Sequence, residues 1–135
     1  MSTASDLVNV LSASLDQLAG AWAQSRTEVA VIAIDGKEVR GAKIAGGTRI
    51  QLLAGIDQAT GAVLVQQNVS EWHNEITYFK PLLEEVTNLD GVVITADALH
   101  TQREHAQYLL SRGAHYVLTV KRNQPKLHEQ LCALP

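Results

Sequence analysis

The sequence predicts an α/β fold in which a mixed sheet of five strands is flanked by helices. The apolar run Val29–Ile34 and the similar stretch Val92–Ala96 each end at an aspartate, and both are typical of strands buried inside an α/β sheet. A hairpin follows the first run. The second run is joined to a later strand through a helix, which requires a right-handed parallel crossover. The expected spatial order of the strands is therefore 3-2-1-4-5.

Residues Ser5–Gln24 are predicted to form a helix that precedes the sheet. Five large apolar residues recur along it at helical spacing, as is typical of a packing surface: Leu7, Leu11, Leu15, Leu18 and Trp22. After the first strand, the glycine-rich segment 41–47 lacks the spacing of a phosphate-binding loop and is expected to be a connector. The hairpin strands are Ile50–Ile56 and Ala62–Val69, and Asp57 between them is expected to be a turn residue.

The second half of the chain is predicted to alternate helices and strands. Besides the strand that ends at 97, the expected elements are helices over 74–87, 101–113 and 125–131 and a strand over 115–120. Pro81 is compatible with the first of these helices if it lies in the first turn, and would otherwise kink it. Thr101–Glu104 has the pattern of a capping box, Gly113 suits the end of the same helix, and Pro125 suits the start of the last one.

Length and composition indicate one compact globular unit. The chain has 135 residues, of which 46% are hydrophobic and 19% charged, so it can bury a core and is unlike a disordered chain. No apolar run is long enough to cross a membrane, and the N-terminus lacks the pattern of a secretory signal. Cys132 is the only cysteine, which excludes an internal disulfide and favours a reducing, cytoplasmic setting.

The charged residues are unevenly distributed along the chain. A net charge of −3 and an isoelectric point near 5.9 are unfavourable for a free-standing DNA-binding protein. Nevertheless, two basic segments, 37–49 and 121–126, each follow a predicted strand. Their cations are Lys37, Arg40, Lys43, Arg49, Lys121, Arg122 and Lys126. These segments are either ordinary solvated loops or basic flanks of the sheet edge that carries the aspartates.

Two strand-terminal aspartates are the strongest chemical signal in the sequence. In the predicted order, Asp35 and Asp97 lie at the same end of adjacent strands, about 5 Å apart, so both carboxylates can reach one hard cation. Aspartates that share a magnesium ion suit phosphodiester chemistry, because the metal polarises the phosphorus and activates a water or hydroxyl. Nucleotide binders, phosphatases and receiver domains also carry such aspartates, and either residue could instead cap a turn or a helix.

Four stretches resemble the transposases of bacterial insertion elements, specifically the ISAs1-type family and its H-repeat relatives in the DDE superfamily. They are AIDGKEVRGA at 33–42, NEIT at 74–77, ITADALHTQ at 94–102 and YVLTVKRNQPKL at 116–127. The resemblance implies an RNase H-like core that acts on DNA with two Mg²⁺ ions (Mn²⁺ is the alternative) and has Asp35 and Asp97 as its first two metal-binding carboxylates. Candidates for phosphate and base contacts near this site are Lys37, Lys121, Arg122, Asn123 and Gln124.

The chain departs from the family pattern at several positions. The family typically has a lysine where this chain has Trp72 and His73, and commonly has a glycine at the position of Arg122. Its third carboxylate lies on a helix further downstream than this chain extends. Glu129, 32 residues after Asp97, offers a substitute, although a surface glutamate on an amphipathic helix is the simpler interpretation.

These departures lead us to expect a truncated catalytic core. Residues 1–28 are interpreted as the tail of a missing N-terminal domain, and residues 29–135 as an RNase H-like core that folds but is inactive alone. The alternative is a non-catalytic module that binds DNA, or that forms a homodimer or pairs with a full-length transposase, because truncation exposes apolar surface. A gene product without any role is a third interpretation.

Overall fold

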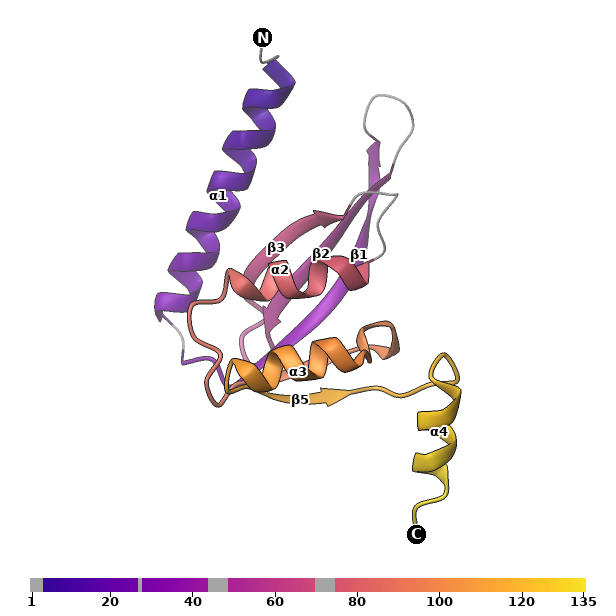
Figure 1. Cartoon of the computed structure of the whole chain (residues 1–135). Coiled ribbons are helices and arrows are strands. Elements are labelled where there is room, and N and C mark those ends of the chain that lie inside the picture. The colour runs from indigo at the N-terminus through magenta and orange to yellow at the C-terminus, as the bar shows by residue number, and fades with distance from the viewer. Residues whose placement is uncertain (1–3, 27, 44–48, 70–74) are drawn as a thin grey trace.

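The computed structural model of the protein describes residues 4–26, 28–43, 49–69 and 75–135. Its centre is a five-stranded sheet with the spatial order β3-β2-β1-β4-β5, which confirms the predicted order (Figure 1). The strands are β1 Val31–Lys43, β2 Arg49–Asp57, β3 Val63–Val69, β4 Val93–Ala96 and β5 His115–Leu118. Strands β1, β2 and β3 form an antiparallel meander, whereas β4 runs parallel to both β1 and β5.

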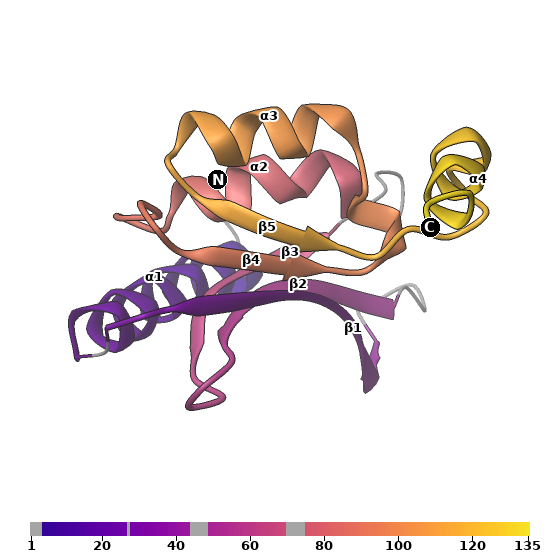
Figure 2. The same cartoon turned by 90° about the horizontal axis from the view of Figure 1, so that it is seen from below.

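Helices α2 and α3 cover one face of the sheet (Figure 2). The α-helices are α1 Ala4–Arg26, α2 Phe79–Glu84, α3 Arg103–Ser111 and α4 Pro125–Cys132, and the 3₁₀ helices are η1 Glu75–Tyr78 and η2 Ala98–His100. Helix α1 packs against β3, while α4 lies beyond the end of β5 (Figure 1). The helix-covered face therefore holds the core, and the opposite face is left open where the pairing of β1 with β4 ends.

The core follows from the alternation of side chains along the strands. On β1 and β4, every second residue is buried toward α2 and α3, as shown by Ile32, Ile34 and Ile94. The helices contribute the large buried side chains Phe79, Leu82, Leu83 and Leu109. The residues between the buried ones project from the opposite face, and Asp35 is one of them.

The segment predicted as a helix over 74–87 is shorter and begins differently. Residue 74 lies outside the described part of the chain, the 3₁₀ helix η1 opens the segment, and the α-helix α2 begins only at Phe79. Pro81 therefore lies in the first turn of α2, where its missing N–H has no intrahelical partner to lose. The helix has no need to kink, which decides between the two placements of Pro81.

The predicted capping box at the start of α3 is wrong. Gln102 is the N-cap residue and its side chain makes no capping hydrogen bond. The Thr101 hydroxyl instead donates to the Thr119 carbonyl oxygen at 2.5 Å, which joins this segment to the residues after β5. Glu104 therefore has no capping partner in Thr101, and it lies exposed on α3. Gly113, with a φ of 71°, ends the helix as predicted.

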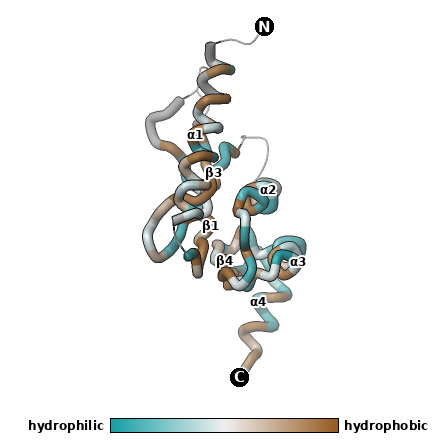
Figure 3. The backbone as a smooth tube through the Cα atoms, turned by 90° about the vertical axis from the view of Figure 1, so that its left-hand side faces the viewer, coloured by the Kyte–Doolittle hydropathy of each residue, from teal (hydrophilic) through white to brown (hydrophobic). Residues whose placement is uncertain are grey.

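The apolar stripe of α1 does not face the sheet. The five residues of the stripe are 57–68% exposed: Leu7, Leu11, Leu15, Leu18 and Trp22. Figure 3 shows hydrophobic bands recurring along α1. Small residues, Gly20 and the buried Ala23, face the sheet instead. The approach to β3 is so close at Gly20 that a Cβ there would collide with the Leu64 carbonyl oxygen. The spacing correctly predicted the helix, but this stripe does not contribute to the core described above.

Candidate functional site

The parallel pairing of β1 with β4 brings Asp35 and Asp97 to the same edge of the sheet. Ile34 and Ala96 are the last residues at which β1 and β4 pair, and each is followed directly by an aspartate. Asp97 comes after the end of β4, whereas β1 continues through Asp35 to Lys43, so the prediction that the first strand ends at Asp35 is wrong. Because Ile34 and Ala96 are buried on the helix-covered face, strand alternation directs the aspartates to the other face. Both aspartates line one shallow depression of about 600 Å³ there, together with Thr95.

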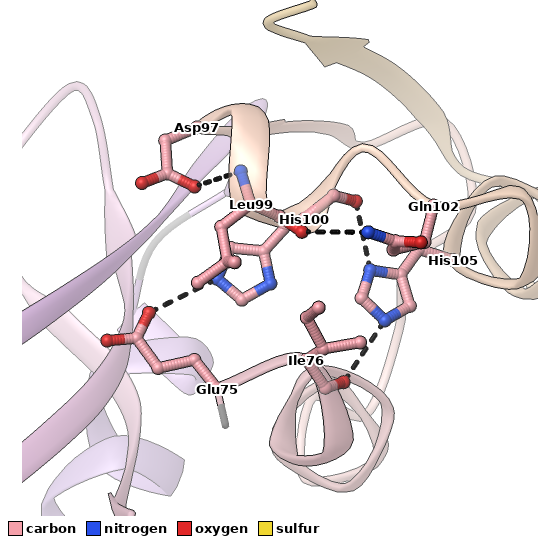
Figure 4. A network of polar contacts seen from close by, with 7 residues as sticks. All are labelled: Glu75, Ile76, Asp97, Leu99, His100, Gln102 and His105. Atoms are coloured by element: carbon pink, nitrogen blue, oxygen red, sulfur yellow. Dashed lines mark hydrogen bonds and ion pairs between the residues drawn. The ribbon is translucent and has the colours of Figure 1, made fainter. Parts of the chain in front are cut away.

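The two aspartates differ in what holds them. The Asp97 carboxylate accepts a hydrogen bond from the Leu99 backbone N–H at 3.0 Å and so caps η2 (Figure 4). The capping role considered from the sequence is thus real for Asp97. Asp35 has Lys37 Nζ at 3.4 Å from its Oδ2, with both side chains more than half exposed. An exposed ion pair of this kind adds little stability. The side chains of Asp35 and Asp97 are both exposed to solvent.

Glu75, the first residue of η1, is a third carboxylate near this edge that the sequence reasoning missed. Its Oε2 lies 3.5 Å from Nε2 of His100, and both of its carboxylate oxygens lie against the backbone of Gly36, the residue after Asp35. Burial raises the pKa of Glu75, and the negative charges of Asp97 and then Asp35 raise it further. The only sequence signal was its place in the NEIT stretch, to which no role was given.

His100, at the end of η2, is buried directly behind Glu75. Its side chain is 1% exposed, and its ring stacks on Phe79 with ring centroids 5.2 Å apart. Burial lowers the pKa of His100, an effect that the nearby Asp97 opposes and His105 reinforces. The short Glu75–His100 distance would suit an ion pair, but burial shifts both pKa values against one. The Glu75–His100 contact is therefore one between a carboxyl group and a neutral imidazole.

His105 ties the two 3₁₀ helices together beneath this contact. Its Nδ1 lies 2.9 Å from the His100 carbonyl oxygen and its Nε2 lies 3.1 Å from the Ile76 carbonyl oxygen (Figure 4). The ring also stacks flat on Phe79, with centroids 4.0 Å apart. His105 therefore links the backbone directly after Glu75 to the backbone carbonyl of His100, and its stacking on Phe79 holds the ring in place.

The basic turn after β5 is held against the same segment. Lys121 and Arg122 are exposed. The side-chain amide of Asn123 donates to the Ala98 carbonyl oxygen at 2.8 Å, and that of Gln124 donates to the Thr101 carbonyl oxygen at 3.0 Å. The structure thus gives the two amides a place in the fold, while their contact with DNA stays a prediction.

Of the other acidic residues considered from the sequence, Asp57 lines the same depression as Asp35 and Asp97, whereas Glu129 does not. Asp57 is a buried turn residue, as predicted, and accepts a hydrogen bond from the Thr60 hydroxyl at 2.6 Å. Glu129 is exposed on α4, and among residues 4–26, 28–43, 49–69 and 75–135 no three His, Cys, Asp or Glu side chains are close enough to hold a metal. Trp72 and His73 lie outside the described residues, as does much of the glycine-rich connector.

Comparisons with known proteins agree with this architecture. Residues 27–130 match the family model of the transposase DDE domain. The chain is 34% identical over 125 residues to "Putative transposase YncI" of Escherichia coli K12, covering 89% of this chain and 50% of the relative. It is 32% identical over 101 residues to the "H repeat-associated putative transposase YhhI" of the same strain, covering 73% of this chain and 26% of the relative. The chain thus spans half or less of the length of these relatives.

Solved structures show the same fold at low sequence identity. The piggyBac transposase, in a synaptic complex with hairpin DNA, matches 81% of this chain and 27% of its own, with a TM-score of 0.57 and 22% identity. The HTLV-2 integrase catalytic core, in complex with magnesium, matches 82% of this chain and 80% of its own, with a TM-score of 0.50 and 15% identity. No helix in the described part of the chain is both long and apolar enough to span a bilayer. The fold is RNase H-like, and the chain belongs to the DDE transposase domain family.

Proposed function

We propose that Asp35 and Asp97 hold a divalent metal ion with which the whole protein cleaves and rejoins DNA during transposition. The observation that carries this proposal is the parallel pairing of Ile34 with Ala96, which brings the two following aspartates to one open edge of the sheet. Membership of the DDE transposase family supports the proposal. In the whole protein, the reaction would be hydrolysis at the transposon ends followed by attack of the freed 3′-hydroxyl on target DNA.

The donor set of this edge fits a hard cation. Asp35, within β1, and Asp97, directly after β4, offer carboxylate oxygens, and Asp97 is fixed further by its hydrogen bond from the Leu99 N–H. Oxygen donors of this kind suit Mg²⁺, with Mn²⁺ as the alternative, and the family resemblance favours a two-ion site. When bound, such an ion would polarise the phosphorus and lower the pKa of the attacking water or hydroxyl. The protein's own part is to hold the phosphodiester against this edge.

Cations on two sides of the edge would bind the DNA backbone. Lys37, beside Asp35 on β1, and the exposed Lys121 and Arg122 in the turn after β5 are proposed to contact phosphates. Asn123 and Gln124 support that turn through their hydrogen bonds to the η2 segment, so a role in DNA contact would be added to a role in the fold. A complex of the piggyBac transposase with hairpin DNA makes DNA the natural partner to test.

The proposal is tested by titrating the protein with Mn²⁺ and following free Mn²⁺ by electron paramagnetic resonance. Asp97→Asn is the preferred variant, because asparagine can still accept the hydrogen bond from Leu99 while losing the charge. Asp35→Asn removes the charge from the other strand. Asp16→Asn, on the exposed surface of α1, is the matched control. We expect both site variants to lose at least tenfold in Mn²⁺ affinity and the control to match the wild type; equal affinity in all four proteins would refute the proposal.

A second copy of the chain is a further proposed partner. The exposed apolar stripe of α1 is the observation that favours it, since large apolar side chains this exposed commonly mark contact surfaces. Light scattering over a range of concentrations would test it, with Leu15→Glu as the variant expected to reduce association. A monomer at all concentrations would contradict self-pairing without affecting the metal site.

A further inference from the structure

The carboxylate of Glu75 is placed between the elements that carry the two aspartates. Residue 75 belongs to η1, which precedes α2, yet its carboxylate rests on the backbone of Gly36 in β1 and its Oε2 faces His100 in η2. Gly36 directly follows Asp35, and His100 lies three residues after Asp97. Three acidic side chains that are far apart in the sequence thus lie near the same end of the β1–β4 pairing, with Glu75 on the Cβ side of Gly36 and Asp35 on the other side of β1.

A second feature, the buried imidazole of His100, lies directly beside Glu75. His100 is 1% exposed, and in the described residues neither of its ring nitrogens has a hydrogen-bond partner. A buried polar group without a partner is costly, so it calls for an explanation. Figure 4 shows the ring turned toward Glu75, where Nε2 reaches 3.5 Å from Oε2. A small inward movement of the Glu75 side chain would complete that hydrogen bond.

We propose that Glu75 is a third carboxylate of the metal site, one that binds the water ligands of the ion held by Asp35 and Asp97, and that His100 positions it. The proposal rests on the proposed function, because it assumes an ion at the two aspartates. It adds an acidic side chain to the site that lies upstream of Asp97 and is distinct from the downstream helix carboxylate expected of the family.

Contact through water, rather than direct ligation, agrees with the geometry. Among the residues that the structure describes, no three acidic, histidine or cysteine side chains are close enough to share an ion directly. Mg²⁺ keeps several of its waters when it binds to proteins, and these waters need hydrogen-bond acceptors. A carboxylate that accepts hydrogen bonds from these waters orients them, and loss of such a partner typically weakens metal binding about 10- to 100-fold.

Gly36 is essential to this arrangement because it leaves room for the carboxylate. A Cβ at position 36 would lie 2.5 Å from Oε2 of Glu75 and 2.6 Å from its carboxyl carbon, too close for either to stay. The obstructed atoms are the far end of a flexible side chain, so Gly36→Ala would displace Glu75 and leave the strand intact. This substitution moves the carboxylate without removing it.

A purely structural role for Glu75 gives a different expectation. An acidic residue in the first turn of a helix is usually stabilised by the helix dipole. Here burial and the two aspartates instead raise the pKa of Glu75, so the charged carboxylate is held in an unfavourable place. A cation bound by the two aspartates would offset their contribution to this shift, although not that of burial. The structural role predicts that substitution changes stability but not metal affinity.

The test is the Mn²⁺ titration applied to Glu75→Gln, Gly36→Ala and His100→Phe, each also unfolded with urea in the absence of metal. Glu104→Gln, on the exposed surface of α3, is the matched control. We expect Glu75→Gln and Gly36→Ala each to weaken Mn²⁺ binding about tenfold. His100→Phe keeps a ring against Phe79 but removes Nε2. Because His100 acts on the ion only by positioning Glu75, this variant should weaken Mn²⁺ binding less, by about threefold.

The outcomes separate this proposal from the one it rests on. If Asp97→Asn weakens Mn²⁺ binding and both Glu75→Gln and Gly36→Ala leave it within twofold of the wild type, Glu75 has no part in the site. If Asp97→Asn itself has no effect, the metal site at the two aspartates is refuted and the role of Glu75 falls with it. Should Glu75→Gln fail to fold, Gly36→Ala decides the matter, because the carboxylate is then retained but displaced.

Discussion

The aromatic stack beneath the candidate site should be the most sensitive point of the fold. Phe79 is fully buried and contacts both His105, at a centroid distance of 4.0 Å, and His100, at 5.2 Å. Burial of such a side chain stabilises a protein by about 1.5–3 kcal/mol. Truncation to alanine also leaves a cavity, so Phe79→Ala should lower the free energy of unfolding by about 4 kcal/mol.

The expected effect is large enough to measure in two ways. For a chain of 135 residues, a loss of about 4 kcal/mol corresponds to a fall in Tm of about 14 °C. Phe79→Leu keeps most of the apolar volume but loses the ring contacts, and should cost about 1 kcal/mol. Urea unfolding followed by circular dichroism gives both values from the shift in midpoint at constant slope.

A partly exposed residue provides the comparison. Leu127→Ala, on α4 with 39% of the side chain exposed, should change the free energy of unfolding by less than 1 kcal/mol. If Phe79→Ala were no more destabilising than Leu127→Ala, the stack would not hold η1 and η2 together, and the account of how Glu75 is positioned would lose its basis.

Three further outcomes are expected. Burial lowers the pKa of His100 in the folded state, so the unfolded chain takes up a proton at this residue first as the pH falls below about 6.5, and the free energy of unfolding should decrease there. The raised pKa of Glu75 has the opposite effect on stability at lower pH. The difference between the urea midpoints at pH 7.5 and 5.5 should therefore shrink in His100→Phe. Thr101→Val removes the hydroxyl that donates to Thr119 and should lower the free energy of unfolding by about 1 kcal/mol, measured by the same urea unfolding. The chain alone should not nick supercoiled DNA, since no three potential ligands in its described residues share an ion directly; Mn²⁺-dependent nicking that Asp97→Asn abolishes would show otherwise.

The sheet could be predicted from the sequence because its signals are local. The buried run into Asp35, the hairpin turn at Asp57 and the helices between later strands each depend on neighbouring residues, and together they leave one strand order. The placement of Asp35 and Asp97 next to the last paired residues of β1 and β4 followed from that order. Helix α1 was likewise recognised from its spacing, but spacing alone does not say which face meets the sheet.

The remainder of the site depends on contacts between distant residues. Glu75 becomes relevant only because Gly36 lacks a side chain and η2 turns His100 toward it, and neither fact has a local signature. Asn123 and Gln124 resembled DNA-contacting residues because they are polar and follow a basic pair. Their amides point to backbone carbonyl oxygens in the fold, a direction that residue type does not reveal.

The hydrogen bonds of those two amides have a mechanical consequence. They fasten the turn that carries Lys121 to the short segment that begins at Asp97, so the basic turn and this aspartate are held at a fixed separation. A DNA strand held by that turn would be presented to the acids at a fixed offset along its backbone.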